Sequence, residues 1–353
     1  MTTAPVPHED GSISGSSKDS GQTFGTHLDD GFPLPTAGMV LHRVLARSAR
    51  TFLLNDMGSE LVEDTDRCET VDALTLRMGA RPLWAQSAAA ALEGTQRRKT
   101  ETERIHQSRV ALRRIRSNLR TFRLALDPAW GTSLRAELAW YGGRLGESRD
   151  LHIMREVVTD KGPEVMAPEE VAVLESVLDT RMAAAVTDVD SERGGARRFQ
   201  LTEQMMVLWD GPAFKAKAGR PAHEVLPAML HRAWHDLRGA SRTARKDATD
   251  ANLHKLRIRL KDLRYGCETV ALVEGGPARK TAKAAERLQS KLGDLHDACF
   301  SILWLEDVAR TERDLSEPID RLVAVQKEAA SAARKGWKRE LKEIERRWRR
   351  WQG

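Results

Sequence analysis

The sequence predicts an all-α protein made of two tandem helical-bundle repeats, in which long antiparallel helices are related by pseudo-twofold symmetry. Three observations support this class. Aromatic residues make up only 5% of the 353 residues, and Trp supplies nine of them against two Tyr, which is poor material for a sheet. Apolar residues recur at helical spacing along most of the chain, and no stretch alternates convincingly as a strand would. The two halves also match one another at a spacing of about 148 residues.

Gly and Pro divide the chain into successive segments with helical periodicity. The first segment, Gly38 to Asp56, places Val40, Leu41 and Leu45 on one face. Further helices are expected at about 101–126, 131–158, 168–190, 196–209, 223–240, 249–273, 278–311 and 316–351. Stops are expected at Pro128, Gly162-Pro163, Gly211-Pro212 and Gly276-Pro277. Several segments exceed 20 residues without a sustained heptad, which favours a bundle of long antiparallel helices.

Residues 1–36 differ in composition from the rest of the chain. Five carboxylates against Lys18 give these residues a charge of −4. Because the net charge of the whole chain is +6, the remainder carries +10. Few apolar residues among many Gly, Ser, Thr and Pro predict a disordered acidic tail. The remaining 37–353 divide into one repeat at about 37–212, with an insertion within 57–100, and a second at about 213–353.

The three cysteines, Cys68, Cys267 and Cys299, lie far apart and form no CxxC pair, so neither a disulfide framework nor a zinc knuckle is encoded. The N-terminus lacks a basic region followed by an apolar one, and no apolar run reaches 18 residues. We therefore expect a cytoplasmic protein with no membrane partner.

The duplicated motif is HxxRxxxBxxR, where B is a basic residue. IHQSRVALRRIRSNLRTF at 105–122 and LHKLRIRLKDLRYGCETV at 253–270 both contain it, at an offset of 148. LGESRDLH at 145–152 returns as LGDLHDAC at 292–299, at an offset of 147. Upstream, VLHRVLAR from Val40 resembles VLPAMLHR from Val225. The preserved order of these motifs indicates a tandem duplication.

On a helical wheel each motif forms a basic stripe opposite an apolar face. The first stripe is His106, Arg109, Arg113 and Arg116, and the second is His254, Arg257, Lys261 and Arg264. Leu112, Ile115, Leu119 and Phe122 lie opposite the first stripe, and Leu256, Leu260, Leu263 and Cys267 lie opposite the second. One such stripe alone is usually a solvated face, but the same pattern twice, with few carboxylates nearby, indicates anion binding. Arg suits phosphate because its planar fork donates two hydrogen bonds, and Lys adds a point charge.

At these motifs the sequence resembles the CHAD family, the conserved histidine α-helical domains. The resemblance covers about residues 37–353 and implies two bundle repeats around a basic central channel that binds inorganic polyphosphate. It implies the binding residues His106, Arg109, Arg113, Arg116, Arg149, His254, Arg257, Lys261, Arg264 and His296, with Arg120, Arg144 and Lys291 as secondary candidates. The sequence departs from the pattern in the 57–100 insertion, in Asp262 where the first copy has Arg114, and in lacking a preceding triphosphate-tunnel domain, whose triphosphatase chemistry we therefore do not expect.

Other candidate sites are weaker. His231 and His235 stand four apart, but the Glu of HExxH is absent and no third metal ligand is marked. Asp150 and Asp297 are expected to orient a neighbouring Arg or His, because one carboxylate per repeat is too few for two-metal phosphate hydrolysis. No phosphate-binding GxxxxGK(S/T) loop or GxSxG elbow is present.

The expected function is therefore non-catalytic binding of polyphosphate, without cofactor or metal, in association with polyphosphate granules. Two alternatives remain open. A body charge of +10 also attracts nucleic acid, and the same cleft is compatible with an enzyme of polyphosphate or nucleotide metabolism. The Trp-rich C-terminus, with Trp337, Trp348 and Trp351, is expected to be an amphipathic last helix and not a base-stacking surface.

Overall fold

The structure is a computed structural model that describes residues 34–56 and 100–352. Within these ranges the chain forms α-helices, three short 3₁₀ turns and two isolated bridges, with no strand. The α-helices are α1 (Ala37–Asp56), α5 (Glu101–Thr121), α6 (Pro128–Val165), α7 (Pro168–Arg193), α8 (Ala196–Asp210), α9 (Ala222–Lys246), α10 (Asp250–Glu274), α11 (Gly276–Thr311), α12 (Ser316–Arg334) and α13 (Trp337–Gln352). The all-α class is therefore confirmed.

Residues 1–33 of the acidic tail predicted at 1–36, and residues 57–99 of the insertion predicted within 57–100, lie outside the described residues. Thr36, the last residue of the predicted disordered tail, instead forms a bridge with Pro221. None of the helices in the described ranges is long and apolar enough to cross a membrane.

Helix ends follow local sequence signals. Thr100 caps α5 by accepting a hydrogen bond from the Glu103 backbone N–H at 3.2 Å, and Thr249 caps α10 in the same way. Asp127 caps α6 ahead of a proline in its first turn, a position where a missing N–H costs nothing. Gly211 ends α8 with a positive φ of 146°.

Two predicted boundaries were wrong. The stop at Gly162-Pro163 does not end α6, which continues to Val165. Instead, Gly162 lets α7 approach closely, because a Cβ there would lie 3.2 Å from a methyl carbon of Val171. The single helix predicted over 316–351 is two helices, α12 and α13. They are divided at Gly336, whose φ of +81° breaks the helical path.

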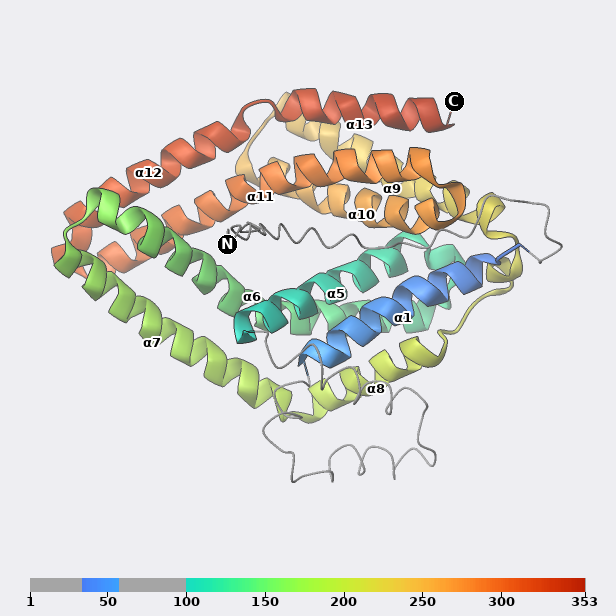
Figure 1. The fold of residues 1–353 in the computed structure, drawn as a ribbon, viewed down its shortest axis with the longest axis horizontal. Coiled ribbons are helices and arrows are strands. Elements are labelled where there is room, and N and C mark those ends of the chain that lie inside the picture. The colour runs from blue at the N-terminus through green and yellow to red at the C-terminus, as the bar shows by residue number, and fades with distance from the viewer. Residues whose placement is uncertain (1–33, 57–99, 353) are drawn as a thin grey trace, which may run out of the picture.

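Figure 1 shows how the helices are arranged, and three apolar clusters hold them together. One joins α1, α5, α6 and α8, and a second joins α9, α10, α11 and α13. The third lies where the outer ends of α6 and α7 meet α11 and α12. The helix neighbours correspond in the two halves: α5 packs against α1 and α6, and α10 packs against α9 and α11.

The apolar faces predicted from the duplicated motif are confirmed. The side chains opposite the two stripes are 0–1% exposed: Leu112, Ile115, Leu119, Phe122, Leu256, Leu260, Leu263 and Cys267. Because these faces are fixed in the core, the opposite faces of α5 and α10 carry the basic stripes towards less buried surroundings.

Direct contacts between α5 and α10 are reciprocal in sequence. Arg114 pairs with Glu268 at 3.1 Å, and Arg120 pairs with Asp262 at 3.0 Å. Asp262 lies 148 residues after Arg114, and Glu268 lies 148 residues after Arg120. Each ion pair therefore joins the position of Arg114 in one copy to the position of Arg120 in the other copy. Both positions carry a positive charge in the first copy and a negative charge in the second.

A second pair of contacts follows the same rule. The Ser117 hydroxyl donates to Asp262 at 3.1 Å, while the Arg114 guanidinium lies 5.5 Å from the centre of the Tyr265 ring. Tyr265 lies 148 residues after Ser117. Asp262, only 7% exposed, thus accepts hydrogen bonds from Ser117 and Arg120, which satisfy its buried carboxylate.

Candidate anion-binding site

Four basic side chains from the two stripes lie within electrostatic reach of one another. Arg109 and Arg113 come from α5, and Arg257 and Lys261 come from α10. Arg257 lowers the pKa of Arg109, and Arg113 lowers the pKa of both Arg257 and Lys261. These four residues are called the central cluster below. Stripes that are 148 residues apart in sequence are therefore close in space.

The pKa of Lys261 is strongly lowered in this cluster. Burial first, and then the charges of Arg257, Arg113 and Arg109, lower its pKa from 10.5 to about 7. Burial likewise lowers the pKa of Arg109 to about 10, although Asp150 opposes this shift. The part of these shifts that the neighbouring cations cause reports a positive potential, which an additional negative charge would relieve.

Three members of the central cluster have no ion-pair partner within the described part of the chain: Arg113, Arg257 and Lys261. The Nε atoms of Arg113 and Arg257 are buried and make no hydrogen bond. Buried donors on charged groups are costly when they are unsatisfied. The cluster therefore presents both unneutralised charge and unused donors.

The LG motifs position one arginine in each half. Arg109 donates to the carbonyl oxygens of Leu145 and Gly146 at 3.1 and 2.8 Å. A Cβ on Gly293, the counterpart of Gly146, would lie 3.6 Å from the Arg257 guanidinium. In both repeats the glycine of the LG motif thus lies beside the second residue of the stripe.

Asp150 and Asp297 lie beside these two arginines. Asp150 is 3.9 Å from Arg109 and also raises the pKa of Arg257 in the other half. Burial raises the pKa of Asp297, while Arg257 and Arg149 lower it. Both carboxylates therefore lie where the orienting role predicted for them is possible.

The histidines lie at the same end of the stripes. Burial lowers the pKa of His106, and the charges of Arg113, Arg149 and Arg109 lower it further. His254 and His296 lie with ring centres 4.7 Å apart, and burial together with Arg257 and His254 lowers the pKa of His296 to about 4. The pKa of His254 is also lowered by burial, and its buried Nδ1 has no hydrogen-bond partner in the described structure.

Two stripe residues face other surroundings. Arg264 is bound to Glu268 at 2.8 Å and to Glu286 at 2.6 Å, and these carboxylates outweigh burial and raise its pKa. Arg116 has its pKa lowered by burial and by Arg120 and Arg135. The structure therefore brings together the first three residues of each stripe and leaves the fourth apart.

The secondary candidates all have carboxylate neighbours. Arg120 pairs with Asp262, Arg144 lies 3.2 Å from Glu192, and Lys291 lies 3.8 Å from Glu340. Arg149, a primary candidate, lies 3.6 Å from Glu156 and also acts on His106 and on Asp297 in the other half.

Two residues near the stripes were missed in the sequence. Arg135 lies close enough to lower the pKa of Arg116, and His152 bonds to Thr102 at 3.0 Å beside Arg149. His152 is the last letter of LGESRDLH, so the motif itself contained the signal. Arg135 lies outside both motifs, and only the packing of α6 against α5 brings it to the stripe.

The remaining sequence candidates have structural neighbours. His231 bonds to Gln352 at 3.0 Å and contacts Trp348 edge-on. Trp337 and Trp348 are buried, and the indole N–H of Trp351 donates to Glu274 at 2.6 Å. The prediction of an amphipathic last helix is therefore confirmed.

The fold and these motifs identify the class of protein. The family model for the CHAD domain matches residues 84–306, and the chain belongs to the CHAD domain family.

Solved structures agree with this fold. The chain is similar to PptA from Streptomyces chartreusis at 21% identity, with 87% of this chain and 99% of that one covered and a TM-score of 0.60. It is also similar to the CHAD domain from the plant Ricinus communis at 16% identity, with coverage of 88% and 92% and a TM-score of 0.59. No curated protein matches the sequence. At these identities the two structures establish the fold alone.

Proposed function

We propose that this protein binds inorganic polyphosphate, without catalysis, in a basic channel between two halves related by a pseudo-twofold axis. The halves are the repeats at about 37–212 and 213–353. The central cluster lies between them, with Arg149 and the three histidines at one end. Association with polyphosphate granules is part of the same proposal, because a granule presents many copies of this ligand.

The reciprocal contacts between α5 and α10 support the twofold relation. In a twofold interface, if position i of one copy contacts position j of the other, then j also contacts i. The pairs Arg114 with Glu268 and Arg120 with Asp262 obey this rule at an offset of 148. A chain of phosphates lying along such an axis would meet equivalent cations on its two sides.

The observation that carries the proposal is the set of unpaired cations contributed by both halves. Arg113, Arg257 and Lys261 have no ion pair in the described residues, and the pKa of Lys261 falls to about 7. Cations that repel one another destabilise the fold, and a polyanionic ligand would neutralise them. Two stripes that approach one another favour a thin polyanion, whose phosphates can alternate between them.

The test measures binding of fluorescently labelled long-chain polyphosphate in the presence of excess tRNA. Charge reversal of Arg113 or of Lys261, which are equivalent positions of the two stripes, should each weaken binding by at least about tenfold, because a buried charge contact is typically worth more than 1.4 kcal/mol. The losses should be comparable. The matched control is Arg232→Glu, because Arg232 is an exposed arginine of α9 outside the stripes.

Three results would contradict the proposal. Loss of binding in only one of the two variants would exclude a shared site. Displacement of polyphosphate by tRNA would favour the nucleic-acid function. Release of phosphate that depends on an added divalent metal would favour the enzyme. Circular dichroism of each variant establishes that helical content is retained.

A further inference from the structure

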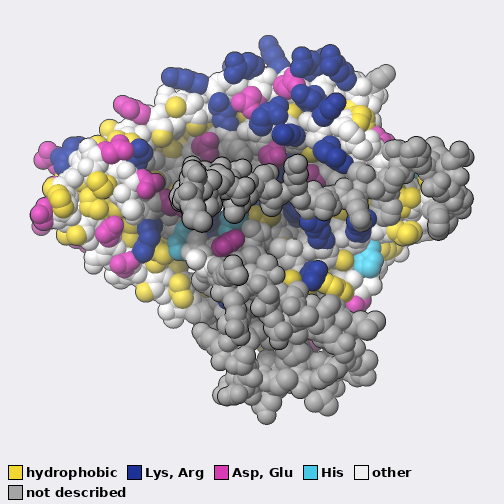
Figure 2. All heavy atoms as spheres, in the orientation of Figure 1, with side chains coloured by type: hydrophobic (Ala, Val, Ile, Leu, Met, Phe, Trp, Pro, Cys, Tyr) yellow, Lys and Arg dark blue, Asp and Glu magenta, His cyan; other side chains and the backbone are white. Residues whose placement is uncertain are grey.

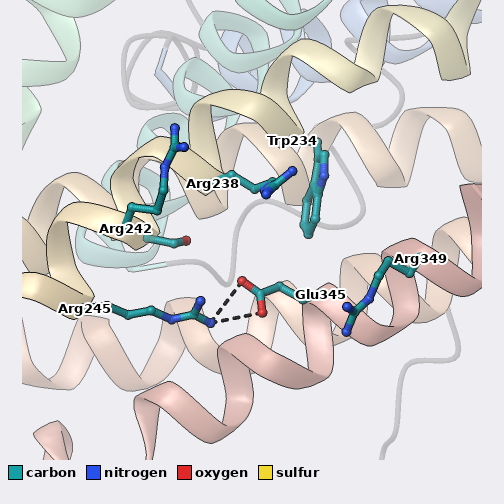
Figure 3. Close-up of a pocket in the computed structure, with 7 residues that line it drawn as sticks. Trp234, Arg238, Arg242, Arg245, Glu345 and Arg349 are labelled. Atoms are coloured by element: carbon teal, nitrogen blue, oxygen red, sulfur yellow. Dashed lines mark hydrogen bonds and ion pairs between the residues drawn. The ribbon is translucent and has the colours of Figure 1, made fainter.

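A basic pocket lies outside the stripes, between α9 and α13 (Figure 3). Its volume is about 280 Å³. Its lining consists of Trp234, Arg238, Ser241, Arg242, Arg245, Glu345 and Arg349. Figure 2 shows Lys and Arg side chains gathered along the edge of the molecule where α13 lies.

The charges in this pocket do not cancel. Arg245 donates two hydrogen bonds of 3.0 Å to Glu345, which joins α9 to α13. Arg238, Arg242 and Arg349 are exposed and have no carboxylate partner within the described ranges. Four guanidinium groups against one carboxylate leave a net charge of about +3 around a concave surface, which suits a ligand with several phosphate oxygens.

An aromatic wall adds a second kind of contact. Trp234 lies at the opposite end of the pocket from Arg245 (Figure 3). One face of its ring is stacked on Trp348, with ring centres 4.7 Å apart and an angle of 10° between the planes. Trp348 is only 3% exposed, so it holds Trp234 in place from the core side. A fixed indole beside guanidinium groups is a surface on which a flat ring can stack.

The pocket is not part of the duplicated pattern. The match of VLHRVLAR with VLPAMLHR aligns Trp234 with Ala49 and Arg238 with Leu53. Both of these α1 residues are buried in the apolar core. The described part of the first half therefore has no counterpart of Trp234 and Arg238 at these positions, and the residues that line the pocket come from α9 and α13.

We propose that this pocket binds a nucleoside triphosphate, with the phosphates on Arg238, Arg242 and Arg349 and the base against Trp234. The proposal does not depend on polyphosphate binding in the central cluster, because it uses different helices and different side chains. It gives the protein a second ligand class, a small aromatic phosphate, beside a site suited to a linear polyanion.

The test is isothermal titration of ATP and of inorganic triphosphate, both without divalent metal. A variant with Arg113→Glu and Lys261→Glu is used beside the wild type, so that the central cluster does not contribute. ATP should bind about tenfold more tightly than triphosphate, because base stacking adds to the phosphate contacts. Triphosphate carries at least as much negative charge, so charge alone predicts the reverse order.

Variants of the pocket separate the two contributions. Arg242→Glu should remove binding of both ligands, and Trp234→Leu should weaken ATP by about tenfold while leaving triphosphate unchanged. Arg349→Glu, on the other helix, should have the same effect as Arg242→Glu. A folding defect in one of the two variants then does not decide the test. Arg232→Glu on α9 is the matched control and should change neither ligand. The proposal fails if ATP does not bind, if triphosphate binds as tightly as ATP, or if Arg242→Glu and Arg349→Glu leave ATP binding intact.

Discussion

The lowered pKa of Lys261 should make the proposed binding of polyphosphate depend on pH between about pH 7 and 10.5. In the free protein, burial and the charges of Arg257, Arg113 and Arg109 lower this pKa to about 7, while Asp297 opposes them. A phosphate chain bound in the cluster as proposed would supply negative charge and raise this pKa back towards 10.5. Binding must then take up a proton wherever the pH lies between these two values.

The sign and size follow from linkage. Between about pH 7 and 10.5 the complex holds a proton that free Lys261 has lost, so affinity falls as pH rises. If the ordinary pKa is fully restored, affinity should fall about 50-fold from pH 7 to 9, which is close to tenfold per unit over most of that range. Bound phosphate would also raise the lowered pKa values of the histidines, so a variant of Lys261 alone is needed to isolate its contribution.

Fluorescence anisotropy with long-chain polyphosphate at constant ionic strength measures this dependence. Long chains are needed because their internal phosphates stay ionised throughout the range. Lys261→Arg is the matched control, since arginine keeps its charge to higher pH even when buried, as Arg109 does with a pKa of about 10. The reasoning is refuted if wild-type affinity changes less than about threefold, or if Lys261→Arg shows the same slope.

The same shift acts on the free protein with the opposite sign. Unfolded Lys261 keeps its proton up to about pH 10.5, whereas the folded chain loses it near pH 7. The unfolded state therefore binds more protons in this window, and the free energy of unfolding gains from this group as pH rises.

Salt should weaken polyphosphate binding steeply: the affinity should fall by about a thousandfold for a tenfold rise in salt concentration if about four cations contact the ligand. A flat salt titration would point to an uncharged ligand. The double change of His106→Gln and His254→Gln should remove any strengthening of binding below about pH 6.5, because both histidines have lowered pKa values that bound phosphate would raise; an unchanged pH profile in the folded variant would make them packing residues. Gly266→Ala should destabilise the protein by about 1 kcal/mol in urea unfolding, because the new Cβ would lie 2.4 Å from Leu230 Cδ1 and overpacking exceeds the gain in helix propensity. Gly239→Ala, with nothing within 4 Å, should stabilise it by about 0.5–1 kcal/mol, and equal effects at the two glycines would contradict this packing argument.

Helical periodicity was sufficient to predict most of the fold, because it reports which face of a helix is buried. The eight side chains assigned to apolar faces are buried, and most helix ends lie within a few residues of their predicted positions. The errors arose at Pro163 and Gly336. Whether a proline or glycine ends a helix depends on what packs beside it, as Val171 does beside Gly162, and that information is not local.

The stripes were predictable for the same reason. The separation of the fourth residue of each stripe from the first three was not predictable. Arg264 shares the spacing of the other stripe residues and is nevertheless held by two carboxylates. Glu268, four residues further along the helix, was a readable signal for one of these pairs. Glu286 comes from α11 and is brought to Arg264 by tertiary packing. The pocket of Arg238, Arg242 and Trp234 was missed because its other wall is α13, which is distant in sequence.

The departure of Asp262 from the duplicated pattern has a consequence for how the halves associate. Under the proposed twofold axis, the position of Arg114 in one half faces the position of Arg120 in the other. Two copies of the first half would therefore place Arg114 against Arg120, and two copies of the second would place Asp262 against Glu268. Only the mixed pair neutralises both contacts, at 3.1 and 3.0 Å. Like charges facing each other would disfavour the wrong pairing, while the opposite charges of the mixed pair favour the right one. Because the charges at these two positions are positive in the first half and negative in the second, each half is favoured to pack on the other and not on a copy of itself. Under the proposed twofold axis, this association keeps the two basic stripes opposed.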